Sequence, residues 1–212
     1  MNTRIVIVAN GRLYKKIIED ITKDDFVIGV DRAAYWLISQ GVIPTVAIGD
    51  FDSTKEKELR VIRRAVKEVK IYPAEKDYTD TELALEYALG QKPSSIVLYG
   101  GSGTRLDHTL SVIHLLQRGV RQRVPIVFRD ETNEVQIFHR CRTILDRKGE
   151  HKYISILPIT NIATISLSGL KYPLHRKNIT FDMTLGISNE FTSKQATITV
   201  HKGEILVIQS SD

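Results

Sequence analysis

The sequence predicts an α/β protein of two domains, a mostly parallel sheet covered by helices and then an all-β sandwich. Three observations lead to this prediction. Continuous β-branched runs, typical of strands buried on both faces of a sheet, alternate with helical patterns in the first part of the chain. The connections between them are short, as in repeated strand–helix–strand units. After about Arg140 the helical periodicity disappears and short alternating segments follow.

The first domain is expected to span residues 1–145 as a Rossmann-like, three-layer α/β/α unit. Its expected strands are Arg4–Ala9, Phe26–Val30, Val46–Gly49, Val69–Tyr72, Ser95–Tyr99 and Ile126–Phe128. Its expected helices are roughly Leu13–Ile21, Arg32–Gln40, Thr54–Glu68, Thr81–Leu89 and Leu106–Arg118. Gly41 and Gly119 stand where two of these helices should end, and Gly90 is a weaker stop of the same type.

The second domain is expected to span residues 146–212 as a β-sandwich. Its expected strands are Tyr153–Leu157, Ala163–Leu167, Asn178–Phe181, Gln195–Val200 and Glu204–Gln209. Turn-prone residues separate these segments, among them Pro158, Gly169 and Gly203. The stretch Asp146–Glu150, which contains Gly149, is the expected boundary between the domains.

The composition is that of an ordinary globular protein, with 212 residues, 42% hydrophobic residues and a formal charge of +5. The positive charges are scattered. The densest basic run, Arg60–Lys70, is interleaved with apolar residues at helical spacing, which favours an amphipathic helix over a nucleic-acid surface. The single cysteine, Cys141, excludes an internal disulfide and fits a reducing compartment. With no membrane span or signal peptide visible, we expect a cytoplasmic protein without nucleic-acid or membrane partners.

Polar and acidic residues collect where the predicted strands end. Since ligands of open α/β sheets bind beyond the carboxyl ends of the strands, loops at these ends should converge on one site. The residues in question are Asp31 after one strand, Asp50 and Asp52 after the next, Lys76, Asp77 and Asp80 after a third, and Gly100, Gly101, Gly103, Arg105, Asp107 and His108 after a fourth.

The motif G-D-F-D-S at 49–53 ends a buried strand with two acids. Side-chain alternation along an extended backbone puts Asp50 and Asp52 on the same side and Phe51 on the other. Ser53 or Asp52 could cap the following helix, but capping explains only one of the acids. Two close carboxylates repel each other unless a cation or a proton lies between them, and Mg²⁺ commonly takes one or two carboxylates. The motif therefore suggests a magnesium site.

The motif E-K-D-Y-T-D-T-E at 75–82 has a structural and a functional interpretation. Thr79 and Glu82 form the pattern of a capping box. Asp80 then lies in the first helical turn, where a negative charge is favoured by the helix dipole. The alternative is that Asp80 is a third carboxylate for the same cation. Lys76 and Asp77 are explained by neither.

The motif Y-G-G-S-G-T-R-L-D-H at 99–108 is a glycine-rich turn from strand to helix. It lacks the spacing of a P-loop or of a dinucleotide fingerprint, and any tight turn can use glycines. Its setting is more informative. Backbone N–H groups at a helix N-terminus can bind phosphate, Arg105 offers a planar fork for phosphate oxygens, and Asp107 could hold that arginine. The role of His108 stays open between a hydrogen-bonding helix residue and a catalyst.

The arrangement favours phosphoryl chemistry. No G-x-S-x-G motif occurs, and Cys141 has no recognisable catalytic partner. In phosphoryl transfer, positioning and charge neutralisation carry most of the catalysis, which suits acids, glycines and an arginine.

These motifs, in this order, resemble the thiamine pyrophosphokinase family. The matching pieces are G-D-F-D-S at 49–53, K-D-Y-T-D-T-E-L-A-L at 76–85, G-G-S-G-T-R-L-D-H at 100–108, and S-L-S-G-L-K-Y-P-L with T-L-G-I-S-N-E at 166–174 and 184–190. Together they span nearly the whole chain.

The resemblance implies an ATP-dependent transferase, thiamine diphosphokinase, with an α/β domain and a β-sandwich. It would move the terminal pyrophosphate of ATP to the hydroxyl of thiamine, giving thiamine diphosphate and AMP, with Mg²⁺. The resemblance also implies a homodimer with its active sites at the interface.

Residue roles follow from the resemblance by matched position. The implied magnesium ligands are Asp50, Asp52 and Asp80. The implied nucleotide-binding residues are Asp31, Lys76, Gly100, Gly101, Gly103 and Arg105. The implied catalytic residues are Asp50, Asp52, Asp77, Asp80, Arg105 and Asp107. Ser188 and Asn189 would help form the thiamine pocket. The chain departs from the family pattern at Arg32, Thr104 and Val112, which concern the nucleotide pocket.

Three other functions remain open at this point. The nearest is a pyrophosphokinase for another small alcohol, such as a hydroxymethyl pterin, because the α/β half could serve either acceptor. A basic nucleic-acid-binding module would need a clustered basic face or exposed aromatic residues. A regulatory protein that binds thiamine diphosphate without making it would not need the acidic cluster.

Overall fold

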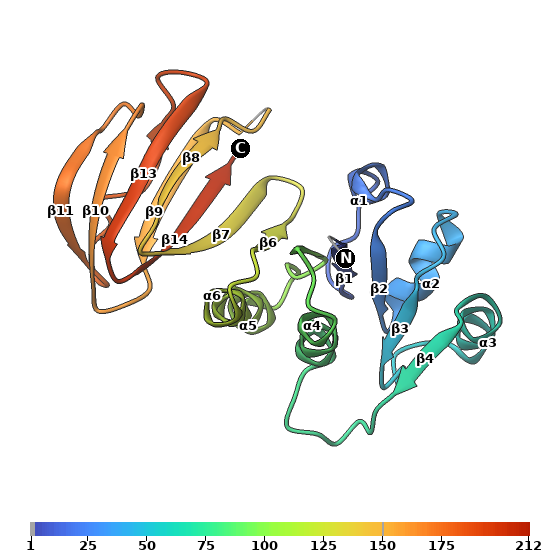
Figure 1. The fold of residues 1–212 in the computed structure, drawn as a ribbon. Helices are drawn as coiled ribbons and strands as arrows, with labels where there is room; N and C mark the ends of the chain where they lie inside the picture. Colours follow the sequence, from blue (N-terminus) through green and yellow to red (C-terminus); the bar gives the residue numbers. More distant parts are fainter. Residues whose placement is uncertain (1–2, 150) are drawn as a thin grey trace. The chain divides into compact units, whose positions relative to one another are not determined.

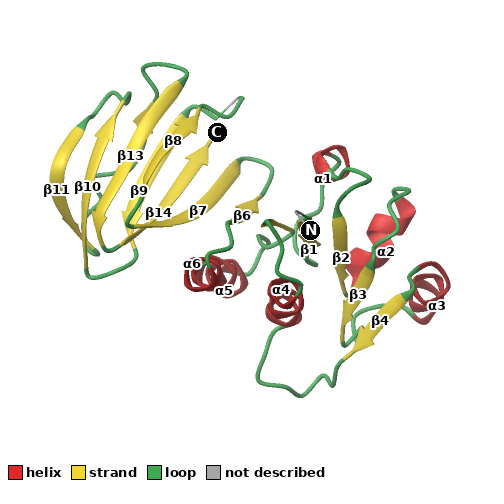
Figure 2. Cartoon of the chain, viewed as in Figure 1, coloured by secondary structure: helices red, strands yellow, loops and turns green. Residues whose placement is uncertain are grey.

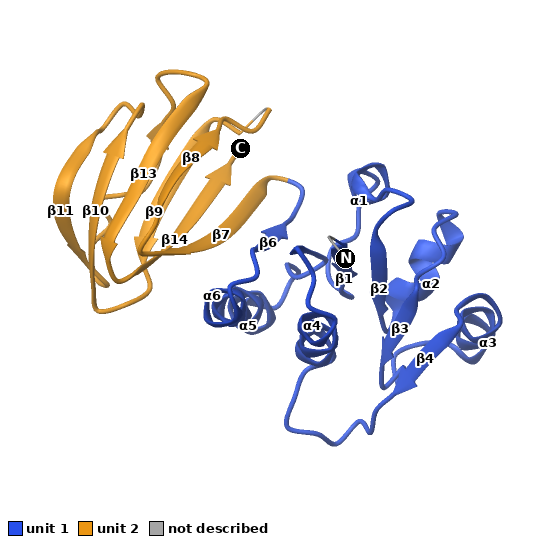
Figure 3. Ribbon diagram, in the orientation of Figure 1, with its two compact units in different colours: residues 1–131 blue, residues 132–212 orange. Residues whose placement is uncertain are grey.

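The computed structural model describes residues 3–149 and 151–212 (Figure 1). The chain forms two compact units, residues 1–131 and residues 132–212 (Figure 3). Within the described residues, helices occur in the first unit and the second is built of strands (Figure 2). The predicted fold class, an α/β domain followed by an all-β domain, is confirmed.

A parallel sheet forms the centre of the first unit. Its strands are β1 (Arg4–Val8), β2 (Phe26–Val30), β3 (Val46–Gly49), β4 (Glu68–Ile71), β5 (Ser95–Tyr99) and β6 (Ile126–Arg129). They lie in the order β6-β5-β1-β2-β3-β4. The chain therefore leaves β1 toward β2 on one side and returns to place β5 on the other. Such a reversal opens a crevice at the carboxyl ends of the two central strands.

Helices cover the sheet because its strands β1, β2, β3 and β5 are apolar and buried on both faces. The helices are α1 (Lys16–Asp20), α2 (Arg32–Ser39), α3 (Glu56–Ala65), α4 (Asp80–Gly90), α5 (Leu106–Leu115) and α6 (Gln117–Gln122). On one face, Val6 and Val8 of β1 pack against Ile17 of α1 and Leu37 of α2. Helix α4 packs against β1, β2 and β3. None of the helices described is long and apolar enough to cross a membrane.

The second unit is a sandwich of two antiparallel sheets. Its strands are β7 (Asn133–His139), β8 (Arg142–Asp146), β9 (Tyr153–Pro158), β10 (Ile162–Ser168), β11 (Leu174–Thr180), β12 (Asn189–Glu190), β13 (Gln195–Lys202) and β14 (Glu204–Ser210). One sheet has the order β12-β9-β14-β7 and the other β11-β10-β13-β8. Their core joins Ile156 and Val207 of the first sheet to Ile165 and Ile198 of the second.

The units divide earlier in the chain than the expected boundary at 145/146. The division lies between Glu131 and Thr132, so β7 and β8 belong to the sandwich. Strand β7 pairs with β14 and β8 pairs with β13, and both partners lie at the end of the chain. Such long-range pairing leaves no local mark that would separate these strands from the preceding segments.

One expected helix end also differs. Gly119 lies inside α6 and does not end a helix. A Cβ at this position would lie 2.5 Å from the carbonyl oxygen of Val124, so the close approach of the following turn explains the glycine.

An arginine at the start of β1 ties three elements together. Arg4 donates from Nε to Asp25 Oδ1 (2.8 Å) and from Nη2 to Asp25 Oδ2 (2.6 Å), while Nη1 contacts Asp20 Oδ2 (3.1 Å). The contact joins β1 to the end of α1 and to the turn before β2. The Asp25 side chain is 4% exposed. The hydrogen bonds from Arg4 hold the pKa of Asp25 below its ordinary value of 3.8.

We predict that Asp25→Ala lowers the free energy of unfolding at pH 7 by about 1–3 kcal/mol, because it leaves Arg4 without its bidentate partner. The neighbouring variant Asp24→Ala removes an exposed acid and should change it by less than about 0.5 kcal/mol. Since the pKa of Asp25 is depressed in the folded chain, its contribution is present above pH 3.8 and is lost as the pH falls through the folded value. Urea denaturation at stepwise lower pH measures both effects. If the difference in the free energy of unfolding between Asp25→Ala and the natural chain stays the same in acid, this account is contradicted.

Candidate active site

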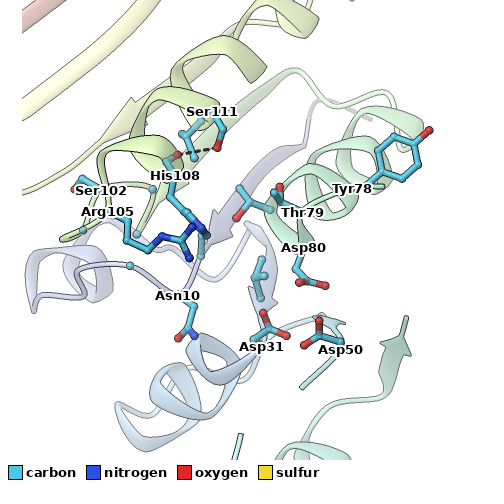
Figure 4. A pocket seen from close by; sticks show the side chains of 18 of the residues that line it. Asn10, Asp31, Asp50, Tyr78, Thr79, Asp80, Ser102, Arg105, His108 and Ser111 are labelled. Atoms are coloured by element: carbon cyan, nitrogen blue, oxygen red, sulfur yellow. Dashed lines mark hydrogen bonds between the residues drawn. The ribbon is translucent and has the colours of Figure 1, made fainter. Parts of the chain in front are cut away.

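A cavity of about 460 Å³ opens at the carboxyl ends of the parallel strands (Figure 4). Every loop that follows β1 to β5 contributes to its wall. The lining residues include Ala9, Asn10 and Gly11 after β1, Asp31 after β2, Asp50 after β3, Lys76 and Thr79 after β4, and Gly100, Gly101, Gly103 and Arg105 after β5. The convergence expected from the sequence is therefore present at one edge of the sheet.

Three carboxylates meet in this cavity. One oxygen each from Asp31, Asp50 and Asp80 lies within 4.8 Å of the other two (Figure 4). Burial, followed by the charge of Asp80, raises the pKa of Asp31 to about 7. Burial likewise raises the pKa of Asp80, and the charge of Asp50 adds to the shift. Oxygen-only donors at this spacing suit a hard divalent cation, and a cation would relieve the repulsion among them.

The turn after β3 explains how Asp31 and Asp50 come together. Asp31 Oδ1 accepts a hydrogen bond from the N–H of Phe51 (3.1 Å). A Cβ on Gly49 would lie 1.8 Å from Asp31 Oδ1, so only glycine leaves room for this carboxylate. Phe51 adopts φ +57° and buries its ring against Ile62 of α3. The left-handed residue is held in place by this packing.

The same turn separates Asp52 from Asp50. Strand β3 ends at Gly49, and the left-handed Phe51 interrupts the alternation that would have put both acids on one side. Asp52 is exposed, and its backbone N–H donates to Asp50 Oδ1 (3.1 Å). Helix α3 begins at Glu56 with Lys55 before it, so neither Asp52 nor Ser53 caps that helix.

Lys76 places a positive charge among the acids. Its Nζ lies 2.9 Å from Asp50 Oδ2 and 3.2 Å from Asp80 Oδ1, and it donates to the carbonyl oxygen of Pro73 at 2.9 Å. Burial would raise the pKa of Asp50, but hydrogen bonds from Lys76 and from the N–H of Asp52 outweigh burial and lower it. The ammonium thus neutralises part of the acidic cluster.

Glycines bring two loops into close contact on the other side of the cavity. The N–H of Gly11 donates to the carbonyl oxygen of Gly100 (2.8 Å), and the N–H of Arg12 donates to that of Ser102 (2.7 Å). A Cβ on Gly11 would lie 2.3 Å from the Ser102 oxygen, and one on Gly100 would lie 2.1 Å from the Ala9 oxygen. Backbone groups rather than side chains therefore form this wall.

Helix α5 begins at this wall and carries the polar residues of the third motif. Arg105, directly before α5, donates to Asp107 from Nε (3.2 Å) and Nη2 (2.6 Å), so Asp107 holds the guanidinium as expected. Arg105 and His108 line the cavity opposite the acidic cluster (Figure 4). The cavity therefore has an acidic wall, whose chemistry suits a cation, and a wall of backbone groups and a guanidinium, whose chemistry suits phosphate.

Comparisons with known proteins match both units of the chain. A family model described as the catalytic domain of thiamin pyrophosphokinase matches residues 18–128, and one described as its vitamin B1 binding domain matches residues 142–205. The chain belongs to the thiamin pyrophosphokinase family. This confirms the resemblance drawn from the motifs, and the family's activity is that of a thiamine diphosphokinase.

Individual relatives agree with the family match. The chain is 39% identical to thiamine pyrophosphokinase of Bacillus subtilis over 98% of its own length and 99% of the relative's. The crystal structure of the Bacillus subtilis protein superposes with a TM-score of 0.93, at 37% identity and 99% coverage of both chains. A structure from Geobacillus thermodenitrificans gives a TM-score of 0.89 at 32% identity, covering 99% of this chain and 98% of that one.

The structure brings most of the predicted residues of the first unit into the cavity. Its lining contains Asp31, Asp50, Lys76, Asp80, Gly100, Gly101, Gly103, Arg105 and His108. Thr79 caps α4 as expected, since its hydroxyl accepts the N–H of Glu82 (3.2 Å). Asp52, Asp77 and Asp107 are exposed and lie outside the lining. Of the departures from the family pattern, Thr104 and Val112 line the cavity and Arg32 lies outside it, paired with Glu58.

The predicted thiamine residues lie in the second unit, at the start of β12. Asn189 is buried, and both ends of its amide form hydrogen bonds: Oδ1 accepts the N–H groups of Tyr172 and Glu190 (both 3.0 Å), and Nδ2 donates to the Tyr172 carbonyl oxygen (2.9 Å). Ser188 is exposed at φ +54°, and its N–H donates to Ser155 Oγ (3.0 Å). Asn189 therefore holds the turn that presents Ser188.

Asn10 and Gly11 are site residues that the sequence analysis missed. Both line the cavity after β1. The available signal was an Asn-Gly pair directly after the first predicted strand, one of the two strand ends at which no polar loop residue was considered.

We predict that Gly11→Ala lowers the free energy of unfolding by about 1–3 kcal/mol, because its Cβ would collide with two backbone oxygens that cannot rotate away. It should also weaken nucleotide binding, since the two glycine loops would separate. Gly90→Ala is the matched control: apart from its chain neighbours and the backbone of its own helix, no atom lies within 4 Å of the added Cβ, and alanine favours the helix. Urea denaturation and titration with ATP measure the two effects. Equal stability of Gly11→Ala and Gly90→Ala would refute the packing argument.

Proposed function

We infer that this chain carries out the reaction of its family, the transfer of the terminal pyrophosphate of ATP to the hydroxyl of thiamine, giving thiamine diphosphate and AMP. The observation that carries this inference is one cavity with an acidic cluster on one wall and the glycine loops and Arg105 on the other. A polyphosphate with its divalent cation matches both walls in charge and in hydrogen bonding.

Carboxylates of this cavity are the proposed ligands of Mg²⁺. Asp50 and Asp80 belong both to the set implied by the motifs and to the three-carboxylate group. The third ligand is proposed to be Asp52 on the resemblance, and Asp31 is the alternative supported by its position in the group. When bound, Mg²⁺ supplies positive charge to the phosphate oxygens.

Residues on the remaining walls are proposed to hold the polyphosphate. Backbone N–H groups of the loop at 100–103 and the guanidinium of Arg105 suit phosphate oxygens, with Asp107 fixing the guanidinium. Lys76 and Asp77 are proposed to lie near the same phosphates.

The reaction then depends on alignment. The hydroxyl oxygen of thiamine forms a bond to the β-phosphorus of ATP while the bond from that phosphorus to the oxygen bridging to the α-phosphate breaks, so AMP leaves with that oxygen. The hydroxyl proton passes to a carboxylate of the site or to water. Ser188, on the turn held by Asn189, is proposed to contact the thiamine.

Product analysis tests the proposal. The purified chain, incubated with MgCl₂, ATP and thiamine, should form AMP and thiamine diphosphate in equal amounts, read by chromatography. Formation of ADP, or AMP without thiamine diphosphate, would refute it. A hydroxymethyl pterin offered in competition with thiamine tests the acceptor, and preferential use of the pterin would favour the other pyrophosphokinase.

We expect Asp50→Asn and Asp80→Asn to lower kcat at least about 100-fold with little loss of thermal stability, because each removes a ligand charge in the cluster. Asp24→Asn, an exposed acid outside the cavity, should leave kcat unchanged. Comparing Asp31→Asn with Asp52→Asn identifies the third ligand as the one whose loss raises the Mg²⁺ concentration needed for half-maximal rate. Normal turnover in Asp50→Asn and Asp80→Asn would exclude the acidic cluster from the reaction.

A homodimer is part of the proposal, as is a cytoplasmic location. An apolar strip in the second unit supports the dimer. Phe181, Met183, Leu185 and Ile187, between β11 and β12, are 41–69% exposed. Large exposed apolar residues grouped in one segment are typical of protein interfaces, and a second copy of the chain would cover them.

We predict that Leu185→Asp shifts the protein from dimer to monomer, because it puts a charge into the apolar strip. Ile43→Asp is the control, since Ile43 is an apolar residue of the first unit, outside the apolar strip, with 63% exposure. Light scattering after size-exclusion chromatography gives the mass of each. A natural chain that is already monomeric at micromolar concentration would exclude the dimer.

A further inference from the structure

The ammonium of Lys76 lies between Asp50 and Asp80, at a position that would also suit a metal cation. Its Nζ contacts a carboxylate oxygen of Asp50 at 2.9 Å and one of Asp80 at 3.2 Å, and its side chain is only 12% exposed. The Asp80 oxygen is buried and has no hydrogen bond, so the ion pair with Lys76 is its polar contact in the described chain. Asp31 contributes the third carboxylate of the group.

The acids need such a partner when no metal ion is bound. Carboxylates that lie within 4.8 Å of one another and are largely shielded from water repel each other strongly. One ammonium offsets part of this repulsion, and it is attached to the chain, so it is always available. A divalent cation supplies twice the charge and would compete for the same oxygens.

We infer that Lys76 is the built-in counter-ion of the acidic cluster, and that a divalent cation entering the cluster displaces its ammonium from Asp50 and Asp80. This inference rests on the proposed function, because it takes the cluster to be a cation site. It goes further because it assigns two exchangeable states to the acidic cluster. In one state the ammonium of Lys76 neutralises part of its charge, and in the other the metal ion does.

The displacement would also free a loop. Lys76 ties the segment between β4 and α4 to the loop after β3 through its contact with Asp50, and it also donates within its own segment to the carbonyl oxygen of Pro73. The ammonium, once released, is still on the rim of the cavity, where a phosphate oxygen can accept its hydrogen bonds. Cation binding thereby prepares a phosphate contact.

A purely structural role for Lys76 is the alternative explanation, in which it only fastens the loop. The two explanations differ in their effect on metal affinity. Loss of a fastening lysine lowers stability and leaves divalent-ion binding unchanged or weaker. Loss of a competing counter-ion strengthens divalent-ion binding.

The test uses the full chain in the absence of nucleotide, with Mn²⁺ as the probe. Binding of Mn²⁺ is measured by electron paramagnetic resonance, and Mg²⁺ is added to displace it. Lys76→Met should bind Mn²⁺ roughly tenfold more tightly than the natural chain, because the competing charge is gone. Lys70→Met is the matched control. Lys70 pairs with Glu68 and lies outside the cavity, so its loss should change the affinity by less than about twofold.

Amine labelling of the natural chain gives a second readout that needs no variant to fold. Acetylation of Lys76, followed by mass spectrometry of its peptide, should be slow without metal and several-fold faster with saturating Mg²⁺, while Lys70 reacts at one rate in both. Equal or weaker Mn²⁺ binding by Lys76→Met, or labelling of Lys76 that Mg²⁺ does not accelerate, would overturn the inference. Absence of Mn²⁺ binding in every variant would instead overturn the proposed cation site, and this inference with it.

Discussion

The repulsion among three carboxylates is the constraint on which the site depends. Asp31, Asp50 and Asp80 come from three separate loops and are held within 4.8 Å of one another. A chain free to relax would let them part. Instead, hydrogen bonds and helix position hold them in place. Asp31 accepts the N–H of Phe51, and Asp50 is bound by Lys76 and by the N–H of Asp52. Asp80 is fixed by its place in the first turn of α4. The folding energy of the sheet thus maintains a cluster that is unfavourable by itself.

The sheet can do this because the site lies where its strand order reverses. Strands β1 and β5 lie next to each other at the centre, and the loops that follow them leave in opposite directions. Glycines at 11 and 100 let the two loops touch through backbone alone, which leaves N–H groups rather than side chains along the cavity wall. The acidic wall and the glycine wall therefore face each other across the cavity. This arrangement suits phosphoryl transfer, in which positioning provides most of the catalysis.

Backbone strain also occurs at two residues that shape the acidic cluster. Asp31 and Phe51 both have positive φ, which costs free energy for residues other than glycine. Burial of Phe51 against α3 offsets this cost on one side of the turn. On the other side, the hydrogen bond from Phe51 to Asp31 joins the two strained residues, so the acidic cluster and the core of the domain stabilise one conformation together.

Sequence alone determined the fold class, the family and the convergence of acidic and glycine-rich loops, because these follow from local periodicity and from motifs that each occupy a few consecutive residues. It did not determine which acids meet. Alternation placed Asp52 beside Asp50, whereas the left-handed Phe51 turns Asp52 outward and Asp31 takes the neighbouring position.

The Asn10–Gly11 loop and the domain limit at Glu131 were also missed. Each of these depends on contacts between residues far apart in the chain: Phe51 packs on α3, Gly11 contacts the loop at 100–102, and β7 pairs with the last strand. Only tertiary structure brings such partners together, so no local pattern could record them.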